Sequence, residues 1–500
     1  MLTPLQRYLE KTPPHRVEPS FVSYIANLQQ IAVTMPHIAA LIVKELESQR
    51  SHLKLIASEN YCSYAVQAAM GNLLTDKYAE GHPQYRYYGG CENIDAIENA
   101  GVEEAKALFG AEHAYIQPHS GADANLVAYW SILAAKVESP ALAELGETNL
   151  SNLTETQWEE LRHKLGNQKL LGLDYYSGGH LTHGYRQNVS ARMFRSYSYA
   201  VDRTTGLLDY DAIEKQAMEI KPLILLAGYS AYPRSVNFRR FREIADKCGA
   251  VLMVDMAHFA GLVAGKAFTG DEDPVQWGDV VTTTTHKTLR GPRGAIILCK
   301  KAFAEFVNKG CPLVLGGPLA HVMAAKAVAL REARSDQYRQ YALKIRENAR
   351  TLAAECVRLG LHVQTGGTDN HLLLLNIAET HGLTGRQGET AMFDCGITLN
   401  RNSLPFDRNG PWWTSGLRIG VPGVTTLGMG EPEMKEIASV VKLVLDGTKP
   451  ADSEKGGISK GRITLDEKIR SQARSQVQTL LEAFPLYPEL DLPSLKTYFL

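Results

Sequence analysis

The stretch that decides the fold is Val280–Gly294, which reads VVTTTTHKTLRGPRG. Its first six residues are all β-branched, and such a run without polar alternation predicts a buried strand of a mostly parallel sheet. Lys287 follows this strand, directly after His286. A lysine flanked by hydroxyl groups at a strand end is well placed to form a Schiff base, provided that its amine is reachable and partly desolvated. The alternative is an ordinary surface lysine.

The segments on either side of this stretch extend the same pattern. Short apolar strands recur between helical segments from Leu53 to about Leu330, which predicts an α/β fold with a mostly parallel sheet in a large domain. Polar residues just beyond the strand ends then lie where open α/β sheets bind ligands. From about Arg331 a second, smaller α/β unit is expected. The expected strands of both units are Ala114–Ile116, Pro222–Ala227, Ala250–Val254, Ala295–Cys299, Leu372–Ile377 and Leu417–Gly420.

Two further segments carry candidate chemistry. In VLMVDMAHFAG, Asp255 ends a strand, where its carboxylate could pair with a protonated pyridine nitrogen or instead cap a helix. His258 could form a hydrogen bond with a hydroxyl group on such a pyridine ring, or it could cap a turn. In QPHSGADAN, Ser120 and Gly121 lie between an apolar run and a helix, and free N–H groups together with the helix dipole make such a turn an anion site. A simple strand-to-helix connection is the alternative.

Composition limits the class of protein. The length of 500 residues predicts two or three domains. The 53 basic and 54 acidic residues leave a net charge of −1, so the overall charge gives no indication of nucleic-acid binding. Seven cysteines, an odd number without a CxxC pair, favour reduced thiols over a disulfide framework. His180 and His183 in HLTH lack an HExxH pattern and a third ligand, so no metal is expected. A polar, proline-broken N-terminus and the lack of a long apolar run predict a cytoplasmic protein without membrane contact.

Three regions are expected along the chain. They are an N-terminal arm and helix at 1–52, a large domain at 53–330, and a small domain at 331–500 with an extended helical tail from about 448. Within the first region, residues 1–30 look like a loosely attached arm and His37–Ser51 has helical spacing. This arm could pack on a partner subunit or on its own domain. The helix of the tail, near Thr464–Phe484, has one apolar face, which favours docking on the small domain.

A polar insert at 137–172 interrupts the large domain. It carries six Glu residues and predicts one short helix, with Thr156 and Glu159 as its capping box and Gly166 at its end. No chemistry is expected from this segment.

Seven segments, in order along the chain, closely resemble serine hydroxymethyltransferase. They are LIASENY (Leu55–Tyr61), KYAEGHPQYRYYGG (Lys77–Gly90), QPHSGADAN (Gln117–Asn125), GGHLTHG (Gly178–Gly184), VDMAHFAGLVAG (Val254–Gly265), TTTTHKTLRGPRG (Thr282–Gly294) and LRIG (Leu417–Gly420). The resemblance is to the bacterial-type cytosolic form, with an insert and a C-terminal extension. It implies the aspartate-aminotransferase-like fold (fold type I) of pyridoxal 5′-phosphate enzymes. The implied reaction is reversible transfer of the serine hydroxymethyl carbon to tetrahydrofolate, which gives glycine and 5,10-methylenetetrahydrofolate.

The resemblance also implies roles for single residues. Lys287 would hold the cofactor as a Schiff base, Asp255 would bind the pyridine nitrogen, and His180 would stack on the ring. Glu80 would transfer a proton at the hydroxymethyl group, and Arg418 would grip the substrate carboxylate through a bidentate pair. The other implied residues are Ser120, Gly121 and Gly317 at the phosphate, Ser230, His258 and His286 near the ring, and Ser58, Tyr78, Tyr87 and Tyr88 around the substrate.

In the family, some of these residues come from the neighbouring subunit, including those at Glu80 and Tyr88. The resemblance therefore implies a homodimer or a larger homo-oligomer with shared active sites. Gly317 is a candidate for a phosphate contact of the same kind. The implied partners are otherwise small molecules: serine, glycine and tetrahydrofolate.

The chain departs from the family pattern in three places. Ala122 stands where many members have a serine, CPLVLGGPL (Cys311–Leu319) lacks the usual Gly-Gly-Gln, and NGPWWTSG (Asn409–Gly416) places two tryptophans in the region used for folate. Two other interpretations stay open: a folate-independent aldolase of β-hydroxy amino acids that uses the same cofactor, and a non-catalytic binding or assembly protein. Retention of Glu80, Tyr87 and Tyr88 favours the transferase over the aldolase.

Overall fold

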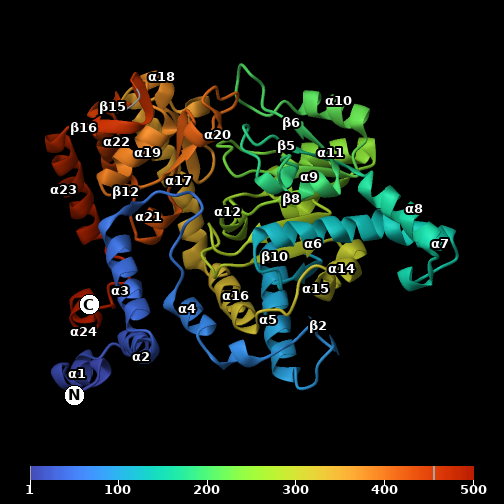
Figure 1. Cartoon of the computed structure of the whole chain (residues 1–500), viewed down its shortest axis with the longest axis horizontal. Helices are drawn as coiled ribbons and strands as arrows, with labels where there is room; N and C mark the ends of the chain where they lie inside the picture. The colour runs from blue at the N-terminus through green and yellow to red at the C-terminus, as the bar shows by residue number, and fades with distance from the viewer. Residues whose placement is uncertain (1, 454–455) are drawn as a thin grey trace.

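A seven-stranded sheet forms the centre of the larger part of the molecule. The computed structural model describes residues 2–453 and 456–500 (Figure 1). The strand order is β4-β10-β9-β8-β7-β5-β6, and all neighbours are parallel except that β10 runs antiparallel to β4 and β9. The strands are β4 (His113–Tyr115), β5 (Lys169–Leu173), β6 (Arg195–Tyr199), β7 (Ile224–Gly228), β8 (Val251–Asp255), β9 (Val280–Thr284) and β10 (Ala295–Cys299). The α/β fold with a mostly parallel sheet is thus confirmed.

Helices cover both faces of this sheet. Successive side chains of a strand point to opposite faces, and on β8 Met253 packs into one apolar cluster while Val254 packs into another. Every residue of β7, β8, β9 and β10 is buried. This double burial is why these strands are apolar or β-branched throughout and do not alternate with polar residues.

A smaller antiparallel sheet forms a second unit. Its order is β11 (Leu372–Asn376), β14 (Gly416–Gly420) and β13 (Asn400–Asn402). Helix α17 (Asp336–Arg358) packs on β11, and α19 (Gly385–Asp394) packs on β13 and β14. Helix α22 (Glu431–Asp446) packs on both of these helices. The predicted boundary at residue 330 lies near the end of α16 (Ala320–Ala333), and the division into domains stays a prediction.

The C-terminal tail begins with a β-hairpin. Strands β15 (Thr448–Asp452) and β16 (Ile458–Leu465) pair antiparallel and precede α23 (Glu467–Ala483). The Gly/Ser/Lys-rich composition of this segment did not predict the hairpin. Helix α23 buries Ala473, Val477, Leu480 and Leu481 and packs on α22, so the predicted apolar face is docked on the second unit.

The N-terminal segment is not a loose arm in its described residues, which corrects that expectation. It folds into α1 (Pro4–Lys11), α2 (Pro19–Thr34) and α3 (Pro36–Ser51), close to the helix predicted at His37–Ser51. Phe21, Ile25 and Val43 share a buried apolar cluster with Leu495 of α24 (Leu492–Phe499), the last helix of the chain. Figure 1 accordingly shows the two chain ends at the same side of the molecule.

The polar insert is shorter than predicted. Helix α6 (Gly121–Leu133) continues through a π-helical turn (Ala134–Glu138) into α7 (Ser139–Glu144), and α8 (Glu155–Gly166) follows. Thr154 and Gln157 form the capping box of α8 in place of Thr156 and Glu159, while Gly166 is its last residue. Residues from Lys169 onward belong to β5, a strand of the central sheet. Helices α7 and α8 project at the edge of the molecule (Figure 1).

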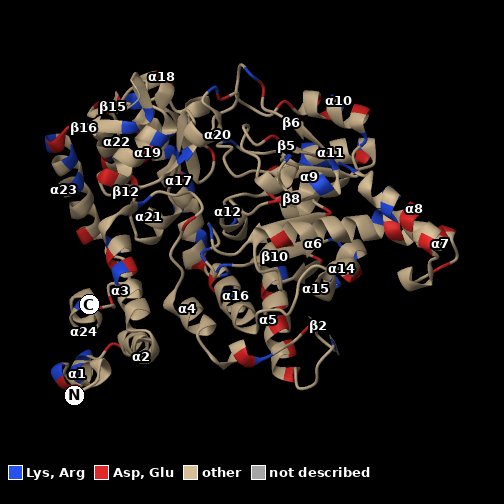
Figure 2. Cartoon of the chain, in the orientation of Figure 1, with Lys and Arg blue, Asp and Glu red and all other residues tan. Residues whose placement is uncertain are grey.

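Acidic and basic residues are interspersed along the helices, in keeping with the nearly balanced charge (Figure 2). Within residues 2–453 and 456–500, no helix is both long and apolar enough to cross a membrane.

Candidate active site

Three chemically distinctive segments meet at the carboxyl edge of the central sheet. Asp255 is the last residue of β8, and Lys287 follows three residues after the end of β9. Asn125, in the first turns of α6, donates a hydrogen bond to the Oδ2 atom of Asp255 at 2.9 Å and accepts one from Thr282 of β9 at 2.6 Å. The helix that starts at the Ser-Gly turn is therefore tied directly to the strands that present Asp255 and Lys287.

Asp255 is held as a buried carboxylate. It is 7% exposed, and its oxygens accept hydrogen bonds from Asn125, from the Ala257 N–H at 3.0 Å and from His183. Burial raises the pKa of this carboxyl group, but the hydrogen bonds from His183 and Asn125 bring the pKa below its usual value. The side chain caps a tight turn with the Ala257 N–H and is not a helix N-cap.

Lys287 presents an amine that is easily deprotonated. Burial lowers the pKa of Lys287 to about 8, even though Asp255 raises it, and Arg418 and Arg293 lower it further. No described residue forms a hydrogen bond or an ion pair with its Nζ atom. Its backbone carbonyl oxygen, in contrast, accepts a hydrogen bond from the Nδ2 atom of Asn60 at 3.0 Å. The main chain is fixed while the amine stays available.

Four neighbouring histidines are neutral. Burial lowers the pKa of His180 to about 4, and its Nδ1 atom accepts the Thr182 N–H at 3.2 Å, so the proton lies on Nε2. Burial also lowers the pKa of His258, and its Nδ1 atom lies 3.2 Å from Nε2 of His371, whose pKa falls to about 3. His286 has a pKa of about 3 because of burial and the charges of Arg293 and Lys287. Its buried Nδ1 atom has no hydrogen-bond partner among the described residues.

Arg418 reaches the same region from the smaller sheet. It lies on β14, and its Nη1 atom donates to the carbonyl oxygen of Ser230 at 2.7 Å, while Nε donates to the Oδ1 atom of Asn400 at 3.1 Å. Burial lowers the pKa of Arg418 to about 10, so the group remains a cation at neutral pH. Arg418, Ser230 and His180 line a cavity of about 420 Å³.

Ser58 comes close to the end of the Arg418 strand. The Gly420 N–H donates to the Leu55 carbonyl oxygen at 2.8 Å, and a Cβ atom on Gly420 would lie 2.3 Å from the Cα atom of Ala57. Glycine is therefore required for this close approach, which brings the residue after Ala57 beside β14.

The Ser-Gly turn has the features of a phosphate site. The Oγ atom of Ser120 accepts the Asp123 N–H at 3.3 Å, while no hydrogen bond to another described residue is made by the N–H groups of Gly121 and Ala122. A Cβ atom on Gly121 would lie 2.8 Å from Cγ2 of Thr284, so the turn packs directly on β9. Free N–H groups at a helix start, a buried carboxylate and a desolvated amine suit the phosphate, the pyridine nitrogen and the aldehyde of pyridoxal 5′-phosphate.

Glu80 lies in a separate cluster. Its carboxylate oxygens accept hydrogen bonds from the Tyr78 hydroxyl at 3.4 Å and from the Tyr88 hydroxyl at 3.2 Å. A Cβ atom on Gly317 would lie 3.2 Å from the Tyr78 ring, so Gly317 belongs to the same cluster. Tyr87 is linked to Glu80 through the backbone, because its N–H donates to the Glu80 carbonyl oxygen at 3.0 Å. No hydrogen bond or ion pair within the described chain joins this cluster to Lys287.

Several contacting residues had no role assigned from the sequence. Asn125, His183 and Asn60 lie inside the motifs QPHSGADAN, GGHLTHG and LIASENY, so the motifs could have pointed to these residues. Their contacts with Asp255 and Lys287 depend on the fold and could not be read from the motifs. His371 carried no signal that separates it from a core histidine. Within the described residues there is no group of three or more His, Cys, Asp or Glu side chains that could hold a metal ion.

Comparison with known proteins places this geometry in a family. The family model described as serine hydroxymethyltransferase matches residues 31–146 and 164–441. Serine hydroxymethyltransferase of Treponema pallidum (strain Nichols) is 66% identical over 495 residues, which cover 99% of this chain and 86% of that protein. The enzymes of the same name from Cutibacterium acnes (strain DSM 16379 / KPA171202) and Chlamydia trachomatis serovar D are 53% and 52% identical, over 94% and 95% of this chain and 96% and 95% of theirs. The gap between the two matched ranges, 147–163, lies within the segment that carries α8. With matches that cover most of its length, the chain belongs to the serine hydroxymethyltransferase family, the fold type I enzymes that depend on pyridoxal 5′-phosphate.

Proposed function

We propose that Lys287 carries the cofactor covalently and that the residues described above act around it in the family reaction. As a serine hydroxymethyltransferase, the chain catalyses reversible transfer of the hydroxymethyl carbon of serine to tetrahydrofolate, giving glycine and 5,10-methylenetetrahydrofolate. The observation that supports the lysine assignment best is the buried, deprotonatable amine of Lys287 beside the buried carboxylate of Asp255. When bound, pyridoxal 5′-phosphate supplies an electron sink that stabilises negative charge at the substrate Cα atom.

Three groups of this chain would hold the cofactor. The carboxylate of Asp255 keeps a proton on the pyridine nitrogen, because its own pKa is low and a positive ring nitrogen is its natural partner. The neutral ring of His180 offers a flat surface for stacking. The N–H groups of Gly121 and Ala122 and the hydroxyl of Ser120 bind the phosphate, with His258, His286 and Ser230 around the ring.

Arg418 would bind and orient the amino acid. Its guanidinium group is fixed by the Ser230 carbonyl and by Asn400, and its remaining N–H groups can hold a carboxylate. By holding the carboxylate, Arg418 would fix how the amino acid lies in the site and therefore which bond at Cα is broken. Ser58, beside the end of β14, would contact the same substrate group.

Glu80 would move the proton at the hydroxymethyl oxygen, from the neighbouring subunit. Among the described residues, its cluster with Tyr78, Tyr88 and Gly317 makes no hydrogen bond or ion pair with Lys287, and Tyr88 is 45% exposed. A homodimer or larger homo-oligomer in which each chain lends this cluster to its partner accounts for both facts. Burial and the charge of Glu80 raise the pKa of Tyr88, so Tyr88 stays a hydrogen-bond donor.

Tetrahydrofolate would bind in the cavity that Arg418 lines. Arg401, Asn402 and Pro411 also line this cavity, and the Arg401 guanidinium lies 5.3 Å from the centre of the Trp412 ring. An aromatic ring of this kind suits a flat pterin. Family membership does not favour a folate-independent aldolase or a non-catalytic protein.

Absorption spectroscopy of the protein reconstituted with pyridoxal 5′-phosphate tests the proposal. We expect visible absorbance from bound cofactor, a change on adding glycine, and a further change only when tetrahydrofolate joins glycine. A spectrum that responds to glycine but ignores folate would support the aldolase instead. Cofactor that separates completely from the denatured protein after borohydride treatment would remove the covalent assignment of Lys287.

A further inference from the structure

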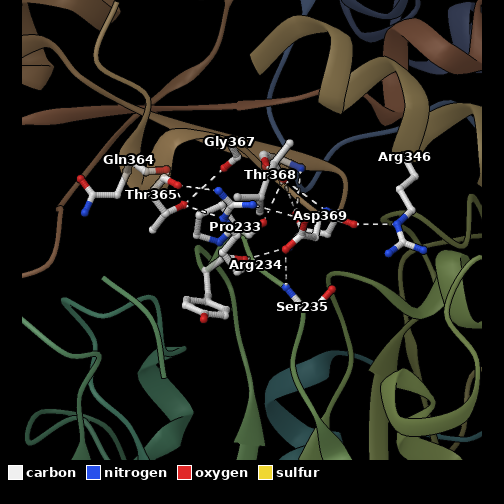
Figure 3. A network of polar contacts seen from close by, with 12 residues as sticks. Pro233, Arg234, Ser235, Arg346, Gln364, Thr365, Gly367, Thr368 and Asp369 are labelled. Carbon is white, nitrogen blue, oxygen red and sulfur yellow. Dashed lines mark hydrogen bonds and ion pairs between the residues drawn. The ribbon is translucent and has the colours of Figure 1, made fainter. Parts of the chain in front are cut away.

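Two loops near Ser230, which lines the cavity with Arg418, are joined by a dense set of polar contacts. Figure 3 shows these contacts. One loop, Tyr229–Ser235, follows strand β7 of the central sheet, and the other, Thr365–Asn370, precedes strand β11 of the smaller sheet. The contacts between these two loops are called the polar seam below. The seam joins the unit that presents Lys287 to the unit that presents Arg418.

Asp369 is the centre of the polar seam. Its N–H donates to the Pro233 carbonyl oxygen at 2.9 Å, and its Oδ2 atom accepts the Ser235 N–H at 3.1 Å (Figure 3). Its Oδ1 atom lies 3.4 Å from Nη1 of Arg234. The Asp369 carbonyl oxygen accepts a hydrogen bond from Nε of Arg346 on α17 at 2.9 Å. Both backbone polar groups and both carboxylate oxygens are therefore engaged, which fixes the orientation of this residue.

Arg234 fixes the second loop. Its Nε and Nη2 atoms donate to the hydroxyl and the carbonyl oxygens of Thr365, at 2.9 Å and 2.5 Å. Thr365 has a φ of +64°, a left-handed conformation that costs free energy in a β-branched residue. The fork of hydrogen bonds from Arg234 holds it in that conformation. Arg234 and Asp369 are each about one-quarter exposed, so their ion pair alone contributes little to stability.

Both loops of the seam lead directly to Arg418. Asn370 is buried, and its Nδ2 atom donates to the Tyr232 carbonyl oxygen at 2.9 Å. Two residues later β11 begins, and its Leu374 is paired with Arg418 of β14. On the other loop, the Ser230 carbonyl oxygen accepts the 2.7 Å hydrogen bond from Nη1 of Arg418. The polar seam thus fixes the position of the strand that carries the Arg418 guanidinium group. It also fixes the position of the Ser230 carbonyl oxygen, which orients that group.

From this arrangement we propose that Arg234 and Asp369 are positioning residues for recognition of the substrate carboxylate. They touch neither substrate nor cofactor and act through Arg418, by holding its strand in place against the Ser230 loop. The inference rests on the proposed role of Arg418. A purely structural seam would change the unfolding temperature alone, whereas a positioning seam changes serine affinity at temperatures where all variants are folded.

Calorimetric titration of the cofactor-loaded enzyme with serine, without folate, tests the proposal. The variants are Asp369→Asn, which keeps the size of the side chain, and Arg234→Met, with Arg234→Lys as the conservative variant. Arg240→Met is the matched control, because Arg240 also forms half-exposed ion pairs, with Asp211 and Glu243, away from the seam. We expect Asp369→Asn and Arg234→Met to weaken serine binding about tenfold, as for loss of a hydrogen bond to a charged group, with a smaller effect on kcat. Arg234→Lys should restore part of the affinity, and Arg240→Met should leave it unchanged.

The same substitutions in an Arg418→Lys background separate this inference from the proposed function. If the seam acts through Arg418, Asp369→Asn should weaken serine binding by less than about twofold once Arg418 is already replaced. A full additional loss in that background, or unchanged affinity of both seam variants in the wild-type background, would overturn the positioning role. If Arg418→Lys itself binds serine like the wild type, the failure lies in the proposed role of Arg418.

Discussion

The Nε2 atom of His183 lies 3.2 Å from the Oδ2 atom of Asp255, and both side chains are buried. The Nδ1 atom of His183 accepts the His180 N–H at 3.3 Å, so the imidazole proton must lie on Nε2. His183 is therefore a fixed donor to the carboxylate. Together with Asn125, it orients Asp255 before any cofactor arrives.

Replacing Asp255 with Asn should remove most of the activity. The amide cannot balance a positive ring nitrogen, and kcat should fall at least about a hundredfold, which corresponds to about 2.7 kcal/mol of transition-state stabilisation. Cofactor content, measured separately, should distinguish this loss from poor binding. Activity close to wild type at full cofactor content would contradict the role assigned to Asp255.

Replacing Lys287 with Ala should abolish covalent attachment of pyridoxal 5′-phosphate. Intact-mass measurement after borohydride treatment should show the adduct in the wild-type protein and none in the variant. Lys301→Ala, at the exposed start of α14 (Lys301–Asn308), is the control and should keep the adduct. An adduct that persists in Lys287→Ala would move the attachment to another lysine.

Cofactor attachment should depend on pH through the Lys287 amine. Burial lowers its pKa to about 8, and the neutral amine is the nucleophile, so the rate of attachment to cofactor-free protein should rise with pH to a midpoint near 8. Because Asp255 raises this pKa, Asp255→Asn should move the midpoint to lower pH. Between about pH 8 and the ordinary pKa of lysine, the unfolded chain binds more protons at this residue than the folded chain does. The contribution of Lys287 to the free energy of unfolding therefore rises with pH in that range. A midpoint near 10.5 in stopped-flow absorbance would show that the amine is solvated.

Two inactive variants should complement each other if active sites are shared. Glu80→Gln and Lys287→Ala each remove one half of the proposed site. After mixing and reassembly, about half of the dimers contain one chain of each kind, and one of their two sites is intact, so about one-quarter of wild-type activity should return. Mixed dimers that form but stay inactive would place Glu80 and Lys287 in the same chain's site.

Trp412 should contribute to folate binding and not to serine binding. Trp412 is 63% exposed, and its ring lies beside Arg401, which lines the cavity. Trp412→Ala should raise the KM for tetrahydrofolate several-fold, since one aromatic contact contributes roughly 1 kcal/mol, while serine affinity stays the same. Trp277→Phe, in helix α13 (Pro274–Trp277), is the control and should leave the KM for tetrahydrofolate unchanged. Equal folate KM values for Trp412→Ala and wild type would show that the pterin binds elsewhere.

Local patterns in the sequence predicted the parts of the site that depend on one strand and its end. Strands β8 and β9 are continuous apolar or β-branched runs, and Asp255 and Lys287 follow from where those runs stop. The contact of Arg418 with Ser230 spans 188 residues and had no local signal. Phe21 and Ile25 pack in one buried cluster with Leu495, far along the chain, which is why residues 1–30 looked loose in sequence alone. The insert was predicted to be too long because the apolar residues of β5 follow the polar helix α8 almost directly.

The helix that begins at Gly121 offers a route for diversification without damage to the chemistry. From Gly121 through the π-helical turn to Glu144, the helix is roughly 35 Å long at 1.5 Å per residue. Residues 147–163, which the family model does not match, lie near its far end. Growth at that end leaves the Ser-Gly turn untouched, because a rigid rod separates the two. The same distance makes the loop before α8 a suitable attachment point for a probe or a surface tether that leaves the enzyme working.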